Sequence, residues 1–310
     1  CIRDRYIIKK GKFMYKIVAK RMLQSNICLM DVEAKRCAHS FLPGQFLVVK
    51  MDEKGERIPL TICDVDKDKG LITIVFQTVG DSTNRMALLE VGDYFEDVVG
   101  PLGNPSDLVE KSKEELQKMN IVFIAGGVGA APVYPQVKYL HEVGVGCDVI
   151  IGARSKDILI LDEEMGKVSK NLYLATDDGS LGFHGNASQC LEDLVKNKGK
   201  KYDHAVIIGP MIMMKFTTMM TKSLGIPTVV SLNSIMVDAT GMCGACRVSV
   251  GKEVKFTCVD GPEFDGYEVN FDEAMRRQTM YKTEEGKKLL RQEDRGTHGK
   301  NPYCDCKEEE

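Results

Sequence analysis

Residues 120–135 read NIVFIAGGVGAAPVYP, which is an apolar run, a glycine-rich turn and the start of a helix-forming segment. A short apolar run that ends in glycines is typical of a buried strand, and the residues from about Pro132 to His141 suit a helix. A strand, a tight turn and a helix form the repeating unit of a parallel α/β sheet. This stretch therefore predicts the fold class of the middle of the chain.

The same alternation continues downstream. Further strand-like runs occupy 147–154, 172–179, 203–210 and 227–233, and helix-like segments occupy 163–171, 184–197 and 211–225. Strands that alternate with helices indicate a doubly wound parallel sheet. We predict this α/β domain over residues 106–233, with a charged helix or linker at 106–119.

Upstream of this domain, residues 14–105 contain short strand-like runs separated by glycine and proline, the pattern of a small antiparallel β-barrel. Residues 1–13 are expected to be an N-terminal extension. Downstream, residues 234–262 carry a cysteine loop as a small domain, and the polar residues 263–310 are expected to form a C-terminal extension and tail. The sequence thus predicts a multidomain β plus α/β protein.

Bulk composition narrows the function classes. The 310 residues carry a formal net charge of −3, which argues against nucleic acid as a partner. No apolar run approaches the roughly 20 residues of a membrane span, and the charged N-terminus lacks the apolar core of a signal peptide. The eleven cysteines are mostly scattered, unlike a secreted disulfide framework, so we expect a cytoplasmic protein.

Glycine-bearing turns follow three of the predicted α/β strands. In the first, Gly127 and Gly129 precede Pro132, which replaces the last glycine of the dinucleotide pattern G-x-G-x-x-G. The others are TDDGSLG at 176–182 and GPMIMM at 209–214. Ligands of open α/β sheets bind beyond the carboxyl ends of the strands, so these turns predict a nucleotide cleft. A tight strand–helix turn without a ligand would also select glycine.

The barrel offers a second candidate site. Thr61 in RIPLTI (57–62) could serve flavin N5, and Gly80, Ser82 and Thr83 in TVGDST (78–83) could cradle a phosphate with N–H and hydroxyl groups. Such residues are also common at strand edges that bind nothing. Spacing alone therefore leaves both interpretations open.

The stretch DATGMCGACRVSVGKEVKFTC at 238–258 carries cysteines at the spacing C-x2-C-x11-C. Asp238 stands five residues before Cys243, in the slot of the first cysteine of a plant-type [2Fe–2S] loop. The pattern predicts a [2Fe–2S] cluster with Asp238, Cys243, Cys246 and Cys258 as ligands. A zinc site of three thiolates plus one other ligand stays open, as does a loop in which Asp238 is merely solvated.

Four motifs together resemble the ferredoxin reductase-like electron-transfer flavoproteins related to the dihydroorotate dehydrogenase electron-transfer subunit. They are RIPLTI, AGGVGAAPVYP, MVDATGMCGACRV and FTCVDGPEFDGYEVNFDEAMRRQ, within about residues 14–285. Inside this family the chain is most similar to the small subunits of NADH-dependent reduced ferredoxin:NADP+ oxidoreductases. The resemblance implies an FAD-binding β-barrel, an NAD-binding α/β domain and a small C-terminal [2Fe–2S] domain.

The resemblance also implies roles for individual residues. Thr61 would be the catalytic contact to flavin N5, and Asp238, Cys243, Cys246 and Cys258 would ligate the cluster. The implied flavin and pyrophosphate contacts are Arg57, Pro59, Leu60, Ile62, Thr78, Gly80, Ser82 and Thr83. The implied NAD(H) contacts are Gly127, Gly129, Ala130, Pro132, Asp178, Gly209, Pro210 and Met211.

The sequence departs from related patterns at two points. Plant-type reductases have R-x-Y-S, whereas Arg57 stands four residues before Thr61 and the tyrosine is missing, which puts the phosphate contact of Arg57 in doubt. The dihydroorotate-type subunit has four cysteines at its cluster, whereas this chain has Asp238. The aspartate favours the ferredoxin:NADP+ branch of the family.

The implied function is an electron-transfer subunit. A hydride would pass between NAD(H) and FAD, and single electrons would pass between FAD and the cluster. The implied partner is a larger flavoprotein subunit with a second FAD and [4Fe–4S] clusters, which would handle NADP(H) and ferredoxin in an electron-bifurcating complex. The alternatives are a dihydroorotate dehydrogenase electron-transfer subunit, a free-standing reductase, and a non-redox zinc-bearing nucleotide-binding module.

Two details stay undecided at this level. Arg154 and Lys156 follow the second α/β strand, where a 2′-phosphate would be read, so the residues leave NAD versus NADP open while the resemblance favours NAD(H). Cys304 and Cys306 form a C-x-C pair in the tail and are expected to be bystanders.

Overall fold

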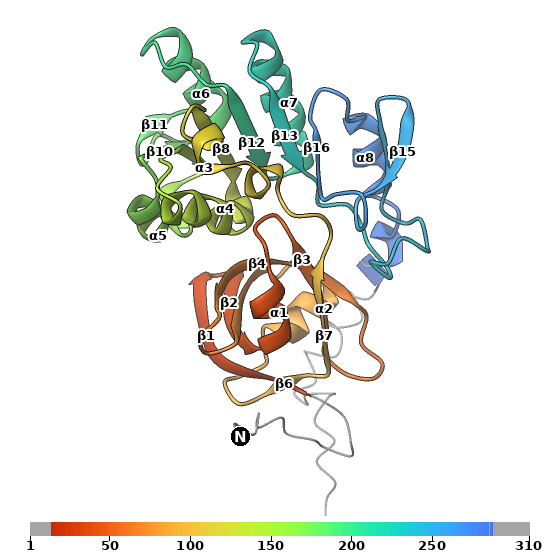
Figure 1. The fold of residues 1–310 in the computed structure, drawn as a ribbon. Coiled ribbons are helices and arrows are strands. Elements are labelled where there is room, and N and C mark those ends of the chain that lie inside the picture. Colours follow the sequence, from red (N-terminus) through yellow and green to blue (C-terminus); the bar gives the residue numbers. More distant parts are fainter. Residues whose placement is uncertain (1–13, 285, 288–310) are drawn as a thin grey trace, which may run out of the picture.

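The computed structural model describes residues 14–284, 286 and 287. Figure 1 shows a β-barrel below, an α/β domain above it, and beside both a smaller unit that we call the cysteine lobe (residues 234–262 and 271–278). The expected N-terminal extension at 1–13 and the pair Cys304 and Cys306 lie outside the described residues.

The barrel is an antiparallel sheet that curls until it is nearly closed (Figure 1), which confirms the predicted barrel. Alternating residues of its strands point inward, as Ile72, Ile74 and Phe76 do with at most 3% of their surface exposed. The strands pair in the order β6-β1-β2-β5-β4-β3-β7. Their bounds are β1 Tyr15–Gln24, β2 Ile27–Glu33, β3 Phe46–Lys50, β4 Ile58–Asp66, β5 Leu71–Gln77, β6 Tyr94–Phe95 and β7 Asp97–Leu102, with helices α1 Lys35–Ser40 and α2 Asp81–Met86.

The α/β domain has five parallel strands in the order β10-β9-β8-β12-β13, so the strand order reverses between β8 and β12. Short β11 continues the sheet beside β10, and β16 pairs antiparallel with β13 at the other edge. The bounds are β8 Ile121–Gly126, β9 Asp148–Ala153, β10 Asn171–Thr176, β11 Phe183–His184, β12 His204–Ile208, β13 Thr228–Ser231 and β16 Glu263–Asp265. A reversal of this kind is where open α/β sheets bind ligands.

Helices cover both faces of this sheet, which confirms the doubly wound prediction. Phe123 and Ala125 of β8 pack with helices α4 Ala130–Glu142 and α5 Asp162–Val168. Val122 and Ile124 point the other way and pack with helices α6 Ala187–Lys196 and α7 Met211–Ser223. Because β8 is apolar on both faces, it reads in the sequence as one continuous apolar run.

Two segments connect the three parts of the structure: residues 106–119 and the chain after residue 262. Residues 106–119 form a 3₁₀ turn at Asp107–Val109 and the one-turn helix α3 Lys113–Leu116, which Ser112 and Glu115 cap reciprocally. In the cysteine lobe, β14 Arg247–Val250 pairs with β15 Glu253–Phe256, and helix α8 Phe271–Arg277 lies beside α7 and β14. The segment after residue 262 therefore joins the sheet through β16 and the cysteine lobe through α8.

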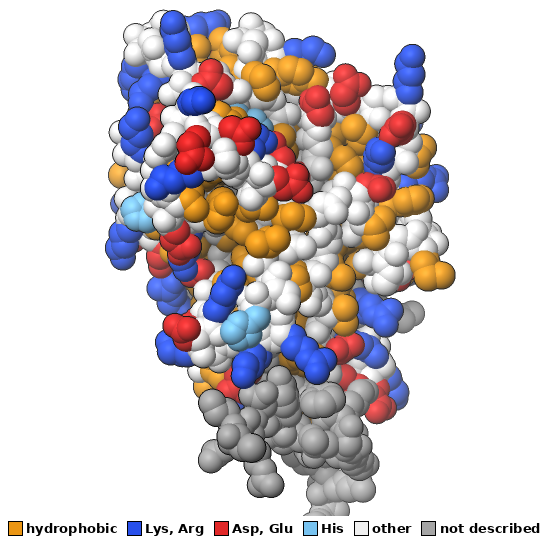
Figure 2. Space-filling model, viewed as in Figure 1, with side chains coloured by type: hydrophobic (Ala, Val, Ile, Leu, Met, Phe, Trp, Pro, Cys, Tyr) orange, Lys and Arg blue, Asp and Glu red, His pale blue; other side chains and the backbone are white. Residues whose placement is uncertain are grey.

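The barrel and the α/β domain meet along α4. Cys63 and Val75 of the barrel belong to the same buried apolar group as α4, and Lys138 of α4 pairs with Asp64 of β4 at 2.7 Å. Lys and Arg side chains are interspersed with Asp and Glu over the visible face of the described residues (Figure 2). Within residues 14–284, 286 and 287, no helix is long and apolar enough to cross a membrane.

Candidate active site and cysteine loop

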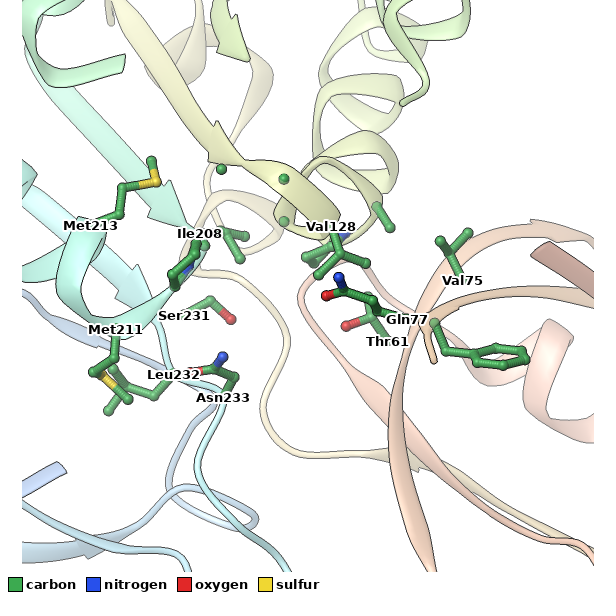
Figure 3. Close-up of a pocket in the computed structure, with 18 of the residues that line it drawn as sticks. Thr61, Val75, Gln77, Val128, Ile208, Met211, Met213, Ser231, Leu232 and Asn233 are labelled. Carbon is green, nitrogen blue, oxygen red and sulfur yellow. The ribbon is translucent and has the colours of Figure 1, made fainter. Parts of the chain in front are cut away.

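A cavity of about 1190 Å³ lies between the barrel and the carboxyl ends of β8, β9 and β12. Figure 3 shows Thr61 of β4 and Gln77 of β5 close to Val128 of the glycine turn. Ile208, Met211 and Met213, with residues 231–233 at the end of β13, form the opposite side. The cavity is thus built jointly by both domains, at the point where the strand order reverses.

Many of the predicted site residues meet in this cavity. Those that line it are Pro59, Leu60, Thr61, Ile62, Thr83, Gly127, Gly129, Pro132, Gly209, Pro210 and Met211. Those that are not part of its lining are Arg57, Thr78, Gly80, Ser82, Ala130 and Asp178. The fold therefore brings the RIPLTI strand together with all three predicted glycine-bearing turns, although the turn at 176–182 contributes Asp177 rather than Asp178.

The loop before α2 is held by its own side chains. The Thr83 hydroxyl accepts the backbone N–H groups of Val79 and Gly80 at 3.0 and 3.1 Å. The Ser82 hydroxyl donates to the Glu56 carboxylate, and the next residue, Arg57, is exposed. A phosphate at the predicted Gly80–Ser82–Thr83 cradle would therefore have to displace Glu56, since two anions repel each other.

The glycine turn after β8 needs its glycines for two different reasons. Gly127 has φ +55°, in the left-handed region, and a Cβ there would point into open space. A Cβ on Gly129 would lie 2.3 Å from the carbonyl oxygen of Ile208. Gly129 is thus required by the close approach of the turn to β12, and Gly127 by its backbone conformation.

At the end of β10, Asp177 lines the cavity instead of the predicted Asp178. Asp178 is exposed, and its carboxylate accepts the Ser180 N–H at 2.9 Å. Hydrogen bonds from the Ser180 side chain first, and then from its backbone N–H, lower the pKa of Asp178. The cavity is lined instead by Asp177 and by Arg154 from the end of β9. Neighbouring residues at a strand end point to different sides. The sequence therefore predicts where the turn lies but does not predict which of its side chains faces the cavity.

Gln77, Gln136 and Asn233 line the cavity but were missed by the sequence analysis. Gln77 is the last residue of β5 and directly precedes the predicted TVGDST motif, so a polar residue at a strand end was the available signal. Gln136 lies inside α4 and Asn233 follows β13. No local pattern distinguishes these two from ordinary polar residues.

The cysteine loop winds tightly around Asp238. Its carboxylate accepts the backbone N–H groups of Thr240 and Cys243, both at 3.0 Å, and the bond from Thr240 is the main cause of the lowered pKa of Asp238. Three residues adopt left-handed backbone conformations: Ala239 (φ +60°), Gly241 (φ +83°) and Gly244 (φ +67°). The loop therefore holds Asp238 beside Cys243 as an ionised carboxylate.

The predicted cluster ligands are only partly gathered. Cys246 and Cys258 lie together in one buried group, whereas Cys243 is exposed. Within residues 14–284, 286 and 287, no three His, Cys, Asp or Glu side chains converge as they would around a metal ion. Burial raises the pKa of Cys258 to about 12, so a metal would have to displace this proton. Three thiols and a carboxylate within one short loop nevertheless fit the chemistry of an iron–sulfur cluster.

Phe46 connects the cavity to the buried cysteines. It lies opposite Thr61 in the β3–β4 pairing and lines the cavity. It also belongs, with Val48, to the buried group that contains Cys246 and Cys258. Phe46 is therefore part of both the cavity wall and the buried group of the cysteine pair.

Comparison with known proteins identifies the family. Residues 233–270 match the model of the iron–sulfur cluster binding domain of dihydroorotate dehydrogenase B. A Thermotoga maritima homologue of the dihydroorotate dehydrogenase B (NAD(+)) electron transfer subunit is 42% identical over 275 residues, covering 89% of this chain and 94% of that protein. The chain belongs to this family of electron-transfer subunits. It is therefore an oxidoreductase subunit.

Two further proteins are similar to this chain over more than nine-tenths of its length. An uncharacterised Clostridium beijerinckii protein encoded in an adh 3′ region is 63% identical over 294 residues, covering 95% of this chain and 99% of that protein. A solved structure of an NADH-dependent reduced ferredoxin–NADP oxidoreductase, studied for flavin-based electron bifurcation, is 40% identical with a TM-score of 0.81, covering 91% of this chain and all of that one.

Family membership bears on the remaining predictions. FAD, an iron–sulfur cluster and NAD(H) are confirmed as the cofactor set of this family. The match of residues 233–270 to a cluster-binding domain favours an iron–sulfur centre over the zinc alternative. The residues that would hold each cofactor stay a prediction.

Proposed function

We propose that this chain is the small subunit of an electron-bifurcating, NADH-dependent reduced ferredoxin:NADP+ oxidoreductase. The observation that carries the proposal is Phe46, which lines the cavity and packs in the same buried group as Cys246 and Cys258. A subunit that relays electrons needs its flavin site and its cluster close together, and a residue shared by the cavity wall and the cysteine group supports that arrangement. The similarity to the bifurcating oxidoreductase supports the same assignment.

The cavity has room for two ligand rings. Its volume of about 1190 Å³ exceeds the range of about 300–1,000 Å³ that is usual for one small ligand. In the proposed arrangement, Pro59, Leu60 and Ile62 would hold the FAD ring, and the Thr61 hydroxyl would serve its N5. The turns at 127–132 and 209–211 would hold NAD(H). Bound FAD would exchange a hydride with NAD(H) and single electrons with the cluster.

The chain's own residues prepare this site in two ways. The Thr61 hydroxyl can donate or accept a hydrogen bond, so it can orient the ring edge that it faces. The aliphatic side chains of Val75, Val128 and Ile208 make much of the wall apolar, which keeps water away from a hydride.

Asp238, Cys243, Cys246 and Cys258 are the proposed cluster ligands. A ligand must be deprotonated, and the backbone hydrogen bonds that lower the pKa of Asp238 keep it ionised. Ligation would require Cys243 to turn toward the Cys246–Cys258 pair. The glycines on either side of it, Gly241 and Gly244, permit this movement.

The proposed partner is a larger flavoprotein subunit with a second FAD and [4Fe–4S] clusters. This partner would bind NADP(H) and ferredoxin. A second candidate function is the electron-transfer subunit of dihydroorotate dehydrogenase B. The match of residues 233–270 to that enzyme's cluster-binding domain and the names of several relatives favour it.

The first test is an anaerobic purification followed by iron, sulfide and flavin quantification and EPR of the dithionite-reduced chain. We expect about two irons and one FAD per chain, with a rhombic [2Fe–2S] signal. Asp238→Cys should keep the cluster and shift its spectrum, and Cys258→Ala should lose it. A colourless, zinc-bearing chain would contradict the redox function, and an Asp238→Cys spectrum identical to wild type would remove Asp238 from the ligand set.

A second assay separates the two candidate functions. The tagged chain is purified with its partner from its own cells, and the complex is offered two reactions. NADP+ reduction that needs both NADH and reduced ferredoxin would support the bifurcating enzyme. Reduction of NAD+ by dihydroorotate would support the second candidate instead.

A further inference from the structure

The last turn of α8 reaches the cysteine loop. Arg277 donates its Nη2 to the carbonyl oxygens of Ala245 at 2.9 Å and Gly244 at 3.4 Å. These two peptides lie between Cys243 and Cys246, so the guanidinium holds the short span that separates two proposed ligands. The Nε of Arg277 is buried and has no hydrogen-bond partner among the described residues.

The residue after Arg277 holds the rim of the cavity. Gln278 donates its side-chain amide to the backbone oxygen of Asn233 at 3.1 Å and to its Oδ1 at 3.0 Å. Both Gln278 and Asn233 line the cavity. The last residue of α8 and its C-cap thus fix the cysteine loop and the cavity rim relative to each other.

The helix itself is well anchored. Asn270 accepts the Glu273 N–H at 3.0 Å and caps the first turn, while Phe271 and Ala274 are buried. Lys215 of α7 pairs with Asp272 at 2.7 Å. Arg277 is therefore presented from a fixed element, and it is not itself part of the cavity lining or of the proposed ligand set.

Among the described residues, no neighbouring carboxylate neutralises the charge of Arg277. An arginine stays positively charged in proteins, and no carboxylate of residues 14–284, 286 and 287 forms an ion pair with this one. Positive charge and hydrogen bonds near an iron–sulfur cluster favour its reduced, more negative form and so raise its reduction potential.

We infer that Arg277 is a positioning residue that holds the 243–246 loop and raises the reduction potential of the cluster bound there. The inference rests on the proposed function, because it needs a cluster at Asp238, Cys243, Cys246 and Cys258. It adds a residue outside the ligand set that decides how readily the cluster accepts electrons from the flavin.

The test is an EPR-monitored redox titration of the purified chain, with iron measured for each variant. Arg277→Gln removes the charge, and we expect the ratio of oxidised to reduced cluster at a fixed potential to rise on the order of tenfold, or ~59 mV for a one-electron couple. Arg277→Lys keeps the charge but loses the planar fork. The ratio of oxidised to reduced cluster in this variant should therefore stay within about twofold of the wild-type ratio. The matched control is Arg276→Gln, which removes the same charge from the exposed neighbouring side chain and should leave the ratio unchanged.

The iron content and the reduction potential of the variants test the two roles of Arg277 separately. An iron-bearing Arg277→Gln with the wild-type potential, or an equal shift in Arg276→Gln, would overturn the inference. If Arg277→Gln loses iron, the holding role is supported, and the charge role is then decided by Arg277→Lys: a lowered potential in this variant overturns it. Wild-type chain without iron would instead overturn the proposed function itself.

Discussion

Phe46 of β3 and Cys246 of the cysteine loop belong to one buried group, and Phe46 also lines the cavity. This buried group joins the barrel to the cysteine lobe across a large sequence separation. If electrons pass between a ring in the cavity and a cluster at Cys246, the packed layer that contains Phe46 lies between them.

We predict that Phe46→Leu slows electron transfer to the cluster more than it slows flavin reduction. The smaller side chain leaves a gap in the packed layer, at a cost of about 1 kcal/mol in stability. Rapid mixing with NADH, followed separately at flavin and cluster wavelengths, measures both steps. Phe41→Leu, in the barrel core away from the cavity lining, is the control and should change neither rate. Equal slowing of both steps in Phe46→Leu would argue against a relay through this layer.

Gly129→Ala should destabilise the protein by about 3 kcal/mol, because its Cβ would meet the Ile208 carbonyl oxygen at 2.3 Å and the backbone must shift. Urea denaturation of both proteins measures the difference. Gly166→Ala is the matched control: the nearest atom to its Cβ is Leu172 Cδ2 at 3.7 Å, and alanine suits the interior of α5 better than glycine. This control should be neutral or stabilising; an unchanged midpoint for Gly129→Ala would show that the turn can relax away from β12.

Glu263 gives stability a defined pH dependence. Burial raises its pKa from 4.5 to about 7, and its Oε1 accepts a 2.7 Å hydrogen bond from Gln136. Between these pH values the folded state keeps a proton that the unfolded state has released. Stability from this group is therefore complete below pH 4.5 and is lost as the pH rises through about 7.

Glu263→Gln should remove this dependence while it keeps the bond to Gln136. We predict that the midpoint of urea unfolding of the variant, relative to wild type, rises from pH 5 to about pH 7 and levels off at higher pH. Glu268→Gln, an exposed acid in the same segment, should show no such trend. A constant difference between Glu263→Gln and wild type over this range would mean that Glu263 is already ionised in the folded state.

Local patterns in the sequence were sufficient for most elements up to residue 233, whereas β16 and its pairing with β13 were not predicted. Alternating inward residues such as Ile72 and Ile74 predict barrel strands, and the two-sided apolar run of β8 predicts a buried parallel strand, because both depend on periodicity within a few residues. The spacing from Asp238 to Cys258 likewise predicts a cluster loop, since its ligands lie close together in the chain. The glycine turns were placed correctly at strand ends for the same reason.

The choice among neighbouring candidates was made by tertiary structure. Asp177 rather than Asp178 lines the cavity, and the hydroxyl of Ser82 faces Glu56. Phe46 and Arg277 carry no local signal at all, because their roles come from segments that meet only in the folded chain. Periodicity is a short-range property, so most strands and helices up to residue 233 and the cysteine loop can be predicted from the sequence. Which side chains share one cavity depends on long-range packing, and it becomes visible only in the folded chain.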